Sequence, residues 1–180
     1  MRKVHIVLLA TTLLIFGCTG QESMEKGTLS VTSSFKNGGE IPKKYTCDGV
    51  NINPPLVIGG VSDKAKSLVI IADDPDAPMG TFTHWIAWNI PVTDRIPEGV
   101  PKAGAVSKPV RMVQGVNDFG KVGYDGPCPP RGEKHRYFFR VYALDTMLDL
   151  EPGADRKELE SAMKGHVIQY GEIMGMYGRS

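Results

Sequence analysis

A cluster of carboxylates follows directly on the apolar segment 67–72. The acids and the prolines between them are Asp73, Asp74, Pro75, Asp76 and Pro78. Clustered carboxylates are ligands of hard divalent cations. The prolines, however, fix the backbone, and the glycine that lets a calcium loop turn sharply is missing, so we expect no metal ion here. A further alternative is that the carboxylates only cap backbone N–H groups of a tight turn.

The segment 123–137 has the most distinctive composition of the chain. Its glycines let the backbone approach a ligand closely, its prolines make that backbone rigid, and it ends in His135, Arg136 and Tyr137. These side chains are donors suited to an anion. A second histidine, His84, precedes another apolar segment. Alone, such a histidine is most often a packed and hydrogen-bonded core residue.

Together these residues favour a site for a negatively charged group. His84, His135, Tyr137 and loop N–H groups can donate, while Asp74 can orient a histidine or accept from a protonated phosphate or an ammonium group. The mixture suits a zwitterionic or monoprotonated ligand better than a dianion. The hypothesis requires that the acidic proline turn and the segment 123–137 come together in space.

Arg136 is expected to have a structural role. Side chains alternate between the two faces of a strand, so Arg136 points away from its neighbours His135 and Tyr137. The nearest carboxylates by this reasoning are Asp73 and Asp76, and we expect an ion pair with one of them.

The elements that must position these residues are mostly strands. Apolar, branched and aromatic composition predicts strands over 29–33, 67–72, 82–90 and 137–144. The segment 67–72 is so uniformly apolar that it belongs in the middle of a sheet, buried on both faces.

One stretch near the C-terminus has helical spacing. Asp155, with Glu158 three residues later, forms an N-terminal capping signature. Apolar residues then recur at helical intervals, at Leu159, Met163, Val167, Tyr170 and Met174. This pattern predicts a C-terminal helix that packs on the sheet.

Length and charge limit the possible functions. A chain of 180 residues accommodates one ordinary domain. Its formal net charge is only +1, which gives no concentrated positive field for nucleic acid.

The first residues have the layout of a secretory signal, a basic start followed by the apolar segment 6–16. That segment is shorter than the roughly 20 residues that cross a bilayer, so cleavage is favoured over insertion. We predict a signal peptide over 1–17, lipidation at Cys18 with a linker over 18–27, and a domain over 28–180. Cys18 can also be incidental, with ordinary secretion following. The protein is thus expected to be exported, and anchored to the membrane as a lipoprotein.

Cys47 and Cys128 remain as a pair in a compartment where disulfides persist. A disulfide between them and two separate buried thiols are both compatible with the sequence.

Several segments resemble the phosphatidylethanolamine-binding protein family, also called the Raf kinase inhibitor family. They are the acidic proline turn 74–78, His84 before a strand that ends at Asn89, and Gly126-Pro127 through His135-Arg136-Tyr137. The segments 45–49, 54–56, 114–118 and 165–168 resemble the bacterial and archaeal branch, the last of them as part of the expected helix. The similar segments span about 29–177.

The resemblance implies a mainly β fold, with a large central antiparallel sheet flanked by a smaller sheet and a C-terminal helix. It also implies a shallow pocket for phosphate-like groups, including phospholipid headgroups. The residues that the resemblance places at the pocket are Asp74, His84, Gly126, His135 and Tyr137, with Asp48 and Pro127 nearby.

Three classes of function follow. We favour a ligand-binding protein without catalytic residues, cofactor or metal. The alternative is an inhibitor of a secreted or membrane protease that uses the rigid proline-rich loops. Kinase regulation occurs among longer eukaryotic relatives and is not assumed here. An enzyme would need a nucleophile such as Cys128 beside His84 and Asp74, and no nucleophile elbow or zinc motif is present. The sequence leaves a homodimer open.

Overall fold

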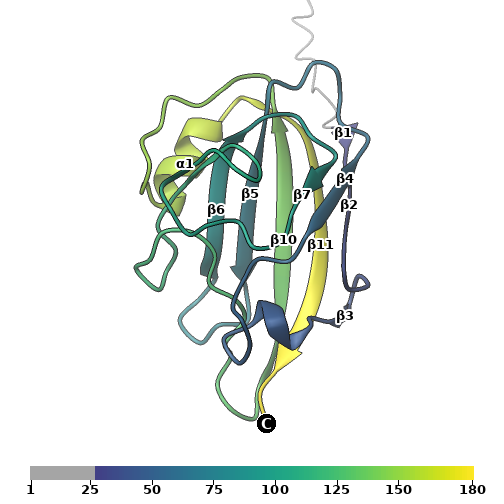
Figure 1. The fold of residues 1–180 in the computed structure, drawn as a ribbon, viewed down its shortest axis with the longest axis vertical. Coiled ribbons are helices and arrows are strands. Elements are labelled where there is room, and N and C mark those ends of the chain that lie inside the picture. Colours follow the sequence, from purple (N-terminus) through teal and green to yellow (C-terminus); the bar gives the residue numbers. More distant parts are fainter. Residues whose placement is uncertain (1–26) are drawn as a thin grey trace, which may run out of the picture.

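The computed structural model describes residues 27–180, which form two β-sheets and a single α-helix (Figure 1). The predicted signal peptide, Cys18 and the linker up to residue 26 lie outside the described residues. The helices are η1 (Lys43–Tyr45, a 3-10 turn) and α1 (Arg156–Met163). The strands are β1 (Gly27–Thr28), β2 (Ser30–Ser33), β3 (Gly39–Glu40), β4 (Leu56–Gly59), β5 (Ser67–Asp74), β6 (Phe82–Ile90), β7 (Arg95–Ile96), β8 (Ala105–Val106), β9 (Met112–Gln114), β10 (Lys134–Leu144) and β11 (Val167–Gly178).

The larger sheet has eight strands, seven of them in the order β1-β11-β10-β5-β6-β9-β8, while β3 pairs with β11. Each of its long strands β11, β10, β5 and β6 pairs antiparallel with the next, and only the short β1 and β3 form parallel pairs, both with β11. All eight residues of β5 are buried, which confirms the central position predicted from its uninterrupted apolar sequence. The smaller sheet has the order β2-β4-β7, so the predicted large sheet flanked by a smaller one is confirmed.

Two apolar cores separate the layers. One lies between the sheets and contains Trp85, Phe139 and Ile173, and the other lies between the large sheet and α1 and contains Trp88 and Leu159. Successive side chains of β6 therefore supply both cores, as the period of two in a strand requires. Burial of both faces fixes the register of the central strands, because a slip of one residue would exchange the two faces.

The predicted helix begins where expected but is far shorter. Asp155 accepts a hydrogen bond from the Glu158 N–H, and the Glu158 carboxylate accepts one from the Asp155 N–H, so the capping box is present. The helix ends at Met163, and Gly165 follows with a φ of 86°. Helix beyond this point was therefore a wrong prediction.

The segment after Gly165 is instead β11, the long edge partner of β10. Its buried positions alternate and include Gln169, Gly171, Ile173 and Tyr177, while Tyr170 remains partly exposed. Residues four apart lie on one face of a strand as well as of a helix, so the spacing of Tyr170 and Met174 did not distinguish the two. Pairing with β10 along its whole length decided the outcome.

Within residues 27–180, no helix combines the length and the apolar character needed to span a bilayer.

Candidate functional site: an imidazole and carboxylate cluster at one end of the large sheet

The site lies where β5 ends and where β6 and β10 begin, at the lower end of the sheet in Figure 1. Antiparallel neighbours bring these three strand ends together although they are far apart in sequence. Asp74 comes from β5, His84 from β6, and His135 and Tyr137 from β10. All four side chains are buried, with residue exposures of 2–4%. The acidic proline turn and the segment 123–137 therefore do converge in space.

His135 joins two carboxylates. Its Nδ1 lies 2.8 Å from Oδ2 of Asp74, and its Nε2 lies 3.0 Å from Oε2 of Glu133. Burial alone would lower the pKa of His135, but the hydrogen bonds to Glu133 and Asp74 outweigh it and the pKa is raised. The geometry therefore favours an imidazolium that donates from both nitrogens.

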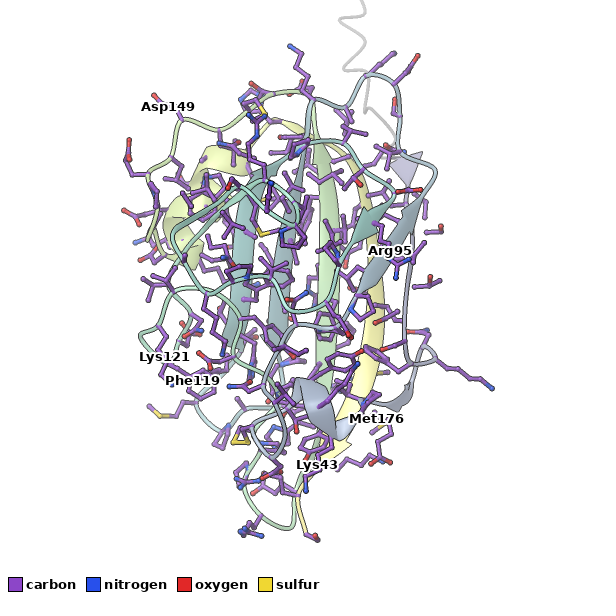
Figure 2. All side chains as sticks on the ribbon, in the orientation of Figure 1. Lys43, Arg95, Phe119, Lys121, Asp149 and Met176 are labelled. Carbon is purple, nitrogen blue, oxygen red and sulfur yellow. A yellow bond between two sulfur atoms is a disulfide. The ribbon has the colours of Figure 1, made fainter. Side chains whose placement is uncertain are left out.

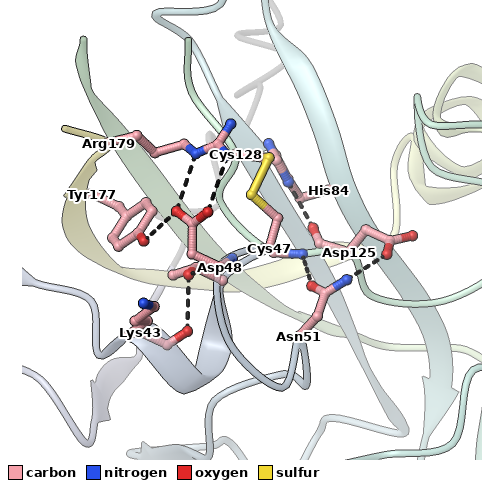
Figure 3. The surroundings of a disulfide bond; sticks show 11 residues. Lys43, Cys47, Asp48, Asn51, His84, Asp125, Cys128, Tyr177 and Arg179 are labelled. Atoms are coloured by element: carbon pink, nitrogen blue, oxygen red, sulfur yellow. Dashed lines mark hydrogen bonds and ion pairs between the residues drawn. A yellow bond between two sulfur atoms is a disulfide. The ribbon is translucent and has the colours of Figure 1, made fainter. Parts of the chain in front are cut away.

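His84 has the opposite character. Its Nδ1 lies 2.7 Å from the carbonyl oxygen of Asp125, and burial lowers its pKa. The ring is therefore neutral near pH 7, with Nδ1 donating to that carbonyl, so Nε2 is the nitrogen that can meet a ligand. The hydrogen bond to Asp125 also ties β6 to the segment 123–137, and Figure 3 shows it.

The Tyr137 ring lies against both histidines. Its centroid is 5.3 Å from that of His84, edge to face, and 6.4 Å from that of His135, nearly parallel. The hydroxyl is buried and is the only such side-chain atom among residues 27–180 that makes no hydrogen bond of normal geometry, although the Asp74 carboxylate and the Cys128 backbone lie near it. Burial and the neighbouring Asp74 carboxylate raise the pKa of Tyr137, so the hydroxyl keeps its proton. A buried donor without a partner is costly, which marks this hydroxyl as a candidate ligand contact.

The turn after β5 contains two carboxylates with different contacts, Asp74 and Asp76. Asp74 uses Oδ2 for His135, while its Oδ1 accepts the N–H of Asp76 at 2.8 Å, so it also caps the turn. Asp76 is paired with Arg136 through both of its oxygens, at 2.6 and 2.9 Å, and the hydrogen bonds from Arg136 lower the pKa of Asp76 to about 2. The expected ion pair of Arg136 is thus formed with Asp76.

Asp73 lies on the opposite face of β5 and takes no part in the site. Its buried carboxylate is 2.9 Å from Nη1 of Arg156 in α1 and 3.2 Å from Nη2 of Arg140 in β10. It therefore connects the helix to the sheet behind Asp74.

Three residues in contact with the cluster were missed from the sequence: Phe82, Phe119 and Glu133. Phe82 and Phe119 pack on the His84 ring at centroid distances of 5.3 and 5.4 Å. Phe119 is 41% exposed and lies at the surface (Figure 2). Phe82 and Glu133 each precede a site histidine by two positions, so strand alternation could have indicated both of them. No sequence signal identifies Phe119.

The segment 123–137 is attached to the loop that follows η1. Cys47 and Cys128 form a disulfide, and the Cys47 N–H donates to the carbonyl of Pro127 at 3.1 Å (Figure 3). The Gly126 N–H donates to Oδ1 of Asn51 at 2.7 Å. A Cβ on Gly126 would lie 2.0 Å from the Tyr45 carbonyl oxygen, so the close approach that requires this glycine is to the protein's own backbone.

Asp48 and Pro127 were expected near the pocket. The Pro127 carbonyl joins the two loops as described, beside Gly126. Asp48 instead accepts hydrogen bonds from the Tyr177 hydroxyl at 2.7 Å and from Nε of Arg179 at 3.1 Å. Figure 3 shows this group on the far side of the disulfide from His84. Asp48 thus contacts Tyr177, the cross-strand neighbour of His135, and Arg179, which follows β11.

The side chains at this site can donate and accept hydrogen bonds and carry charge of both signs. Cys128 is oxidised in the disulfide, so it provides no thiolate nucleophile beside the histidines. Within residues 27–180, no group of three or more His, Cys, Asp or Glu side chains is arranged to hold a metal ion.

Comparison with known proteins identifies the family. The model of the phosphatidylethanolamine-binding protein family matches residues 31–178. A UPF0098 protein of Pyrococcus horikoshii is 64% identical over 177 residues, covering 98% of this chain and 89% of that protein. A UPF0098 protein of Aquifex aeolicus is 53% identical over 149 residues, covering 81% of this chain and 85% of that protein.

Two solved structures are similar along nearly their whole length. The crystal structure of a phosphatidylethanolamine-binding protein homolog from Chlamydia trachomatis has a TM-score of 0.77 and 42% identity, and the match covers 86% of this chain and 99% of that one. The structure of E. coli YbcL, described as a member of the mammalian family, has a TM-score of 0.77 and 31% identity, covering 84% and 99%. The chain therefore belongs to the phosphatidylethanolamine-binding protein family.

Proposed function

We propose that this protein binds a phosphate group, free or in a phospholipid headgroup, without catalysing a reaction. The observation that carries the proposal is the buried Tyr137 hydroxyl, which makes no hydrogen bond of normal geometry and lies beside an imidazolium, a neutral imidazole and a carboxylate. The names of the family and of the Chlamydia homolog, which refer to binding of phosphatidylethanolamine, agree with a ligand of this chemistry.

Each group has a defined part in the proposed complex. The Tyr137 hydroxyl donates to a phosphate oxygen, and the His135 imidazolium supplies the positive charge. Neutral His84 accepts from a protonated phosphate or an ammonium group through Nε2. Asp74 orients His135 through the 2.8 Å hydrogen bond and keeps it protonated.

The site is also pre-formed. The disulfide and the hydrogen bond from Gly126 to Asn51 hold the segment 123–137 in place before any ligand arrives. A rigid pocket loses little conformational freedom on binding, which favours affinity.

Tyr137→Phe provides the sharpest test. Removing this buried hydroxyl should leave the free energy of unfolding unchanged or raise it, yet weaken binding of glycerophosphoethanolamine, a singly charged phosphodiester, about tenfold, the effect of one lost hydrogen bond to a charged group. Titration calorimetry and urea unfolding measure the two quantities. Unchanged affinity in Tyr137→Phe would contradict the assignment of the hydroxyl.

Substitutions of His84 and Asp74 test the rest of the site. His84→Ala and Asp74→Asn should each weaken glycerophosphoethanolamine binding, whereas His166→Ala should not, because His166 is exposed and pairs with Asp145 outside the site. Should all three leave binding unchanged, the site is assigned wrongly. Inhibition of secreted proteases with no detectable phosphate binding would instead favour the inhibitor alternative.

We also propose that the protein is exported and anchored by a lipid on Cys18. The sequence pattern of the first 18 residues supports this. An anchored domain would sit close to phospholipid headgroups. The intact mass of the native protein measures processing and acylation, and a mass equal to the full unmodified chain would exclude both.

A further inference from the structure

Glu133 occupies the one nitrogen of His135 that Asp74 leaves free. Its Oε2 lies 3.0 Å from Nε2 of His135, and its side chain is 53% exposed while that of the histidine is 5% exposed. The partner carboxylate Asp74 is buried, also at 5% side-chain exposure. The imidazolium thus lies between two carboxylates, and the three groups together carry a surplus of one negative charge.

Two cations of the described chain, Arg136 and Lys102, contact segments that carry the cluster, and each is held by another carboxylate. Arg136, which follows His135 on β10, is held by both oxygens of Asp76. Lys102 reaches the segment 123–137 but is paired with Asp125 at 3.0 Å, and that carboxylate also accepts from two asparagine side chains. A second negative charge on a ligand would therefore meet the Glu133 carboxylate, while Arg136 and Lys102 are already paired with Asp76 and Asp125.

The backbone around Glu133 is fixed although its side chain is at the surface. The Glu133 N–H donates to the Pro130 carbonyl at 3.1 Å, and its own carbonyl accepts from the Arg179 N–H at 3.3 Å. The Gly132 N–H donates to the Arg179 carbonyl at 2.7 Å. This turn therefore holds the Glu133 carboxylate next to Nε2 of His135. Rotation about the side-chain bonds of Glu133 is sufficient to move the carboxylate away.

We propose that Glu133 sets the charge selectivity of this site, admitting singly charged phosphodiesters and disfavouring doubly charged phosphomonoesters. The inference rests on the proposed function of the same site. A phosphodiester keeps one negative charge at neutral pH, whereas a phosphomonoester is mostly a dianion, since its second pKa is about 6. Either ester competes with the Glu133 carboxylate for the His135 N–H, but only the dianion adds a charge that the cluster does not neutralise.

The test compares two small esters that differ in charge, dimethyl phosphate and methyl phosphate, near neutral pH. Calorimetry gives the affinity of wild-type protein, Glu133→Gln and the control Glu151→Gln for each. Glu133→Gln should shift the affinity ratio about fivefold toward methyl phosphate, the effect of one half-exposed unit charge about 4 Å away. Glu151→Gln removes an equal charge from an exposed loop and should leave the ratio unchanged.

The protonation state of His135 is followed by NMR in the same samples, because loss of the Glu133 carboxylate also removes a hydrogen bond that stabilises the imidazolium. Ratios are compared at pH values where this ring is equally protonated. If the wild-type protein binds both esters but Glu133→Gln leaves the affinity ratio unchanged, the proposed selectivity is refuted, whereas the assignment of the binding site is not. If neither ester binds to any of the three proteins, the proposed function fails and the inference with it.

Discussion

Replacing Cys47 and Cys128 together by serine removes a cross-link between residues separated by 81 positions. In the chain-entropy description, a closed loop of this length lowers the entropy of the unfolded chain by about 15 cal/mol/K, which is about 4.5 kcal/mol near 25 °C. Native strain and residual structure in the unfolded state reduce the effect, so we expect the free energy of unfolding to fall by about 3–4.5 kcal/mol.

The double variant should nevertheless fold. The same two loops are joined by hydrogen bonds from the Cys47 N–H to Pro127, from the Tyr124 hydroxyl to the Tyr45 carbonyl at 2.7 Å, and from Gly126 to Asn51. These contacts do not depend on the sulfur atoms, so the loops should keep their places in the folded state.

Urea unfolding of the oxidised domain and the double serine variant measures the difference, with the wild-type domain reduced by dithiothreitol as a second comparison. The slope with denaturant should be slightly larger without the cross-link, because the unfolded chain then exposes more surface. A loss below about 1 kcal/mol, with the disulfide shown by mass to be formed in wild type, would refute the argument that it acts by constraining the unfolded chain.

NMR titration should place the pKa of His135 above 6.5 and that of His84 below it, and the reverse order would contradict the opposed environments of the two rings. The raised pKa of His135 adds stability that is fully present below pH 6.5 and is lost as the pH rises through the folded-state pKa. His135→Gln should therefore reduce the decrease in the free energy of unfolding over this pH range. Gly126→Ala should destabilise the domain by about 2 kcal/mol or more, because the new methyl group would meet the Tyr45 carbonyl, and an unchanged melting temperature would show that the loop yields freely. Asp155→Ala should lower the free energy of unfolding by about 1 kcal/mol through loss of the helix cap, and the same loss in a Glu158→Ala background would argue against a reciprocal capping box.

The candidate site was only partly visible in sequence. Sequence composition predicted a cluster of polar side chains at strand ends, formed by Asp74, His84, His135 and Tyr137. The family resemblance pointed to the same residues. Phe82, Phe119 and Glu133 were missed; strand alternation could have indicated Phe82 and Glu133, whereas the contact of Phe119 with the His84 ring depends on the fold. Asp48 was expected near the pocket, but its carboxylate points to Tyr177 and Arg179.

Elements whose residue pattern has a single structural interpretation were predictable from the sequence. The fully apolar run of β5, the aromatic β6 and the capping signature at Asp155 each specify local structure through side-chain period and backbone hydrogen bonding. That Val167–Gly178 forms a strand could be known only from the fold. A spacing of four residues is compatible with both helix and strand, and the hydrogen bonds to β10 select the strand. The tertiary structure also decided the pairing of Cys47 with Cys128 and the sharing of His135 between Asp74 and Glu133. Such contacts depend on the distance between side chains in the folded chain, and sequence spacing does not encode that distance.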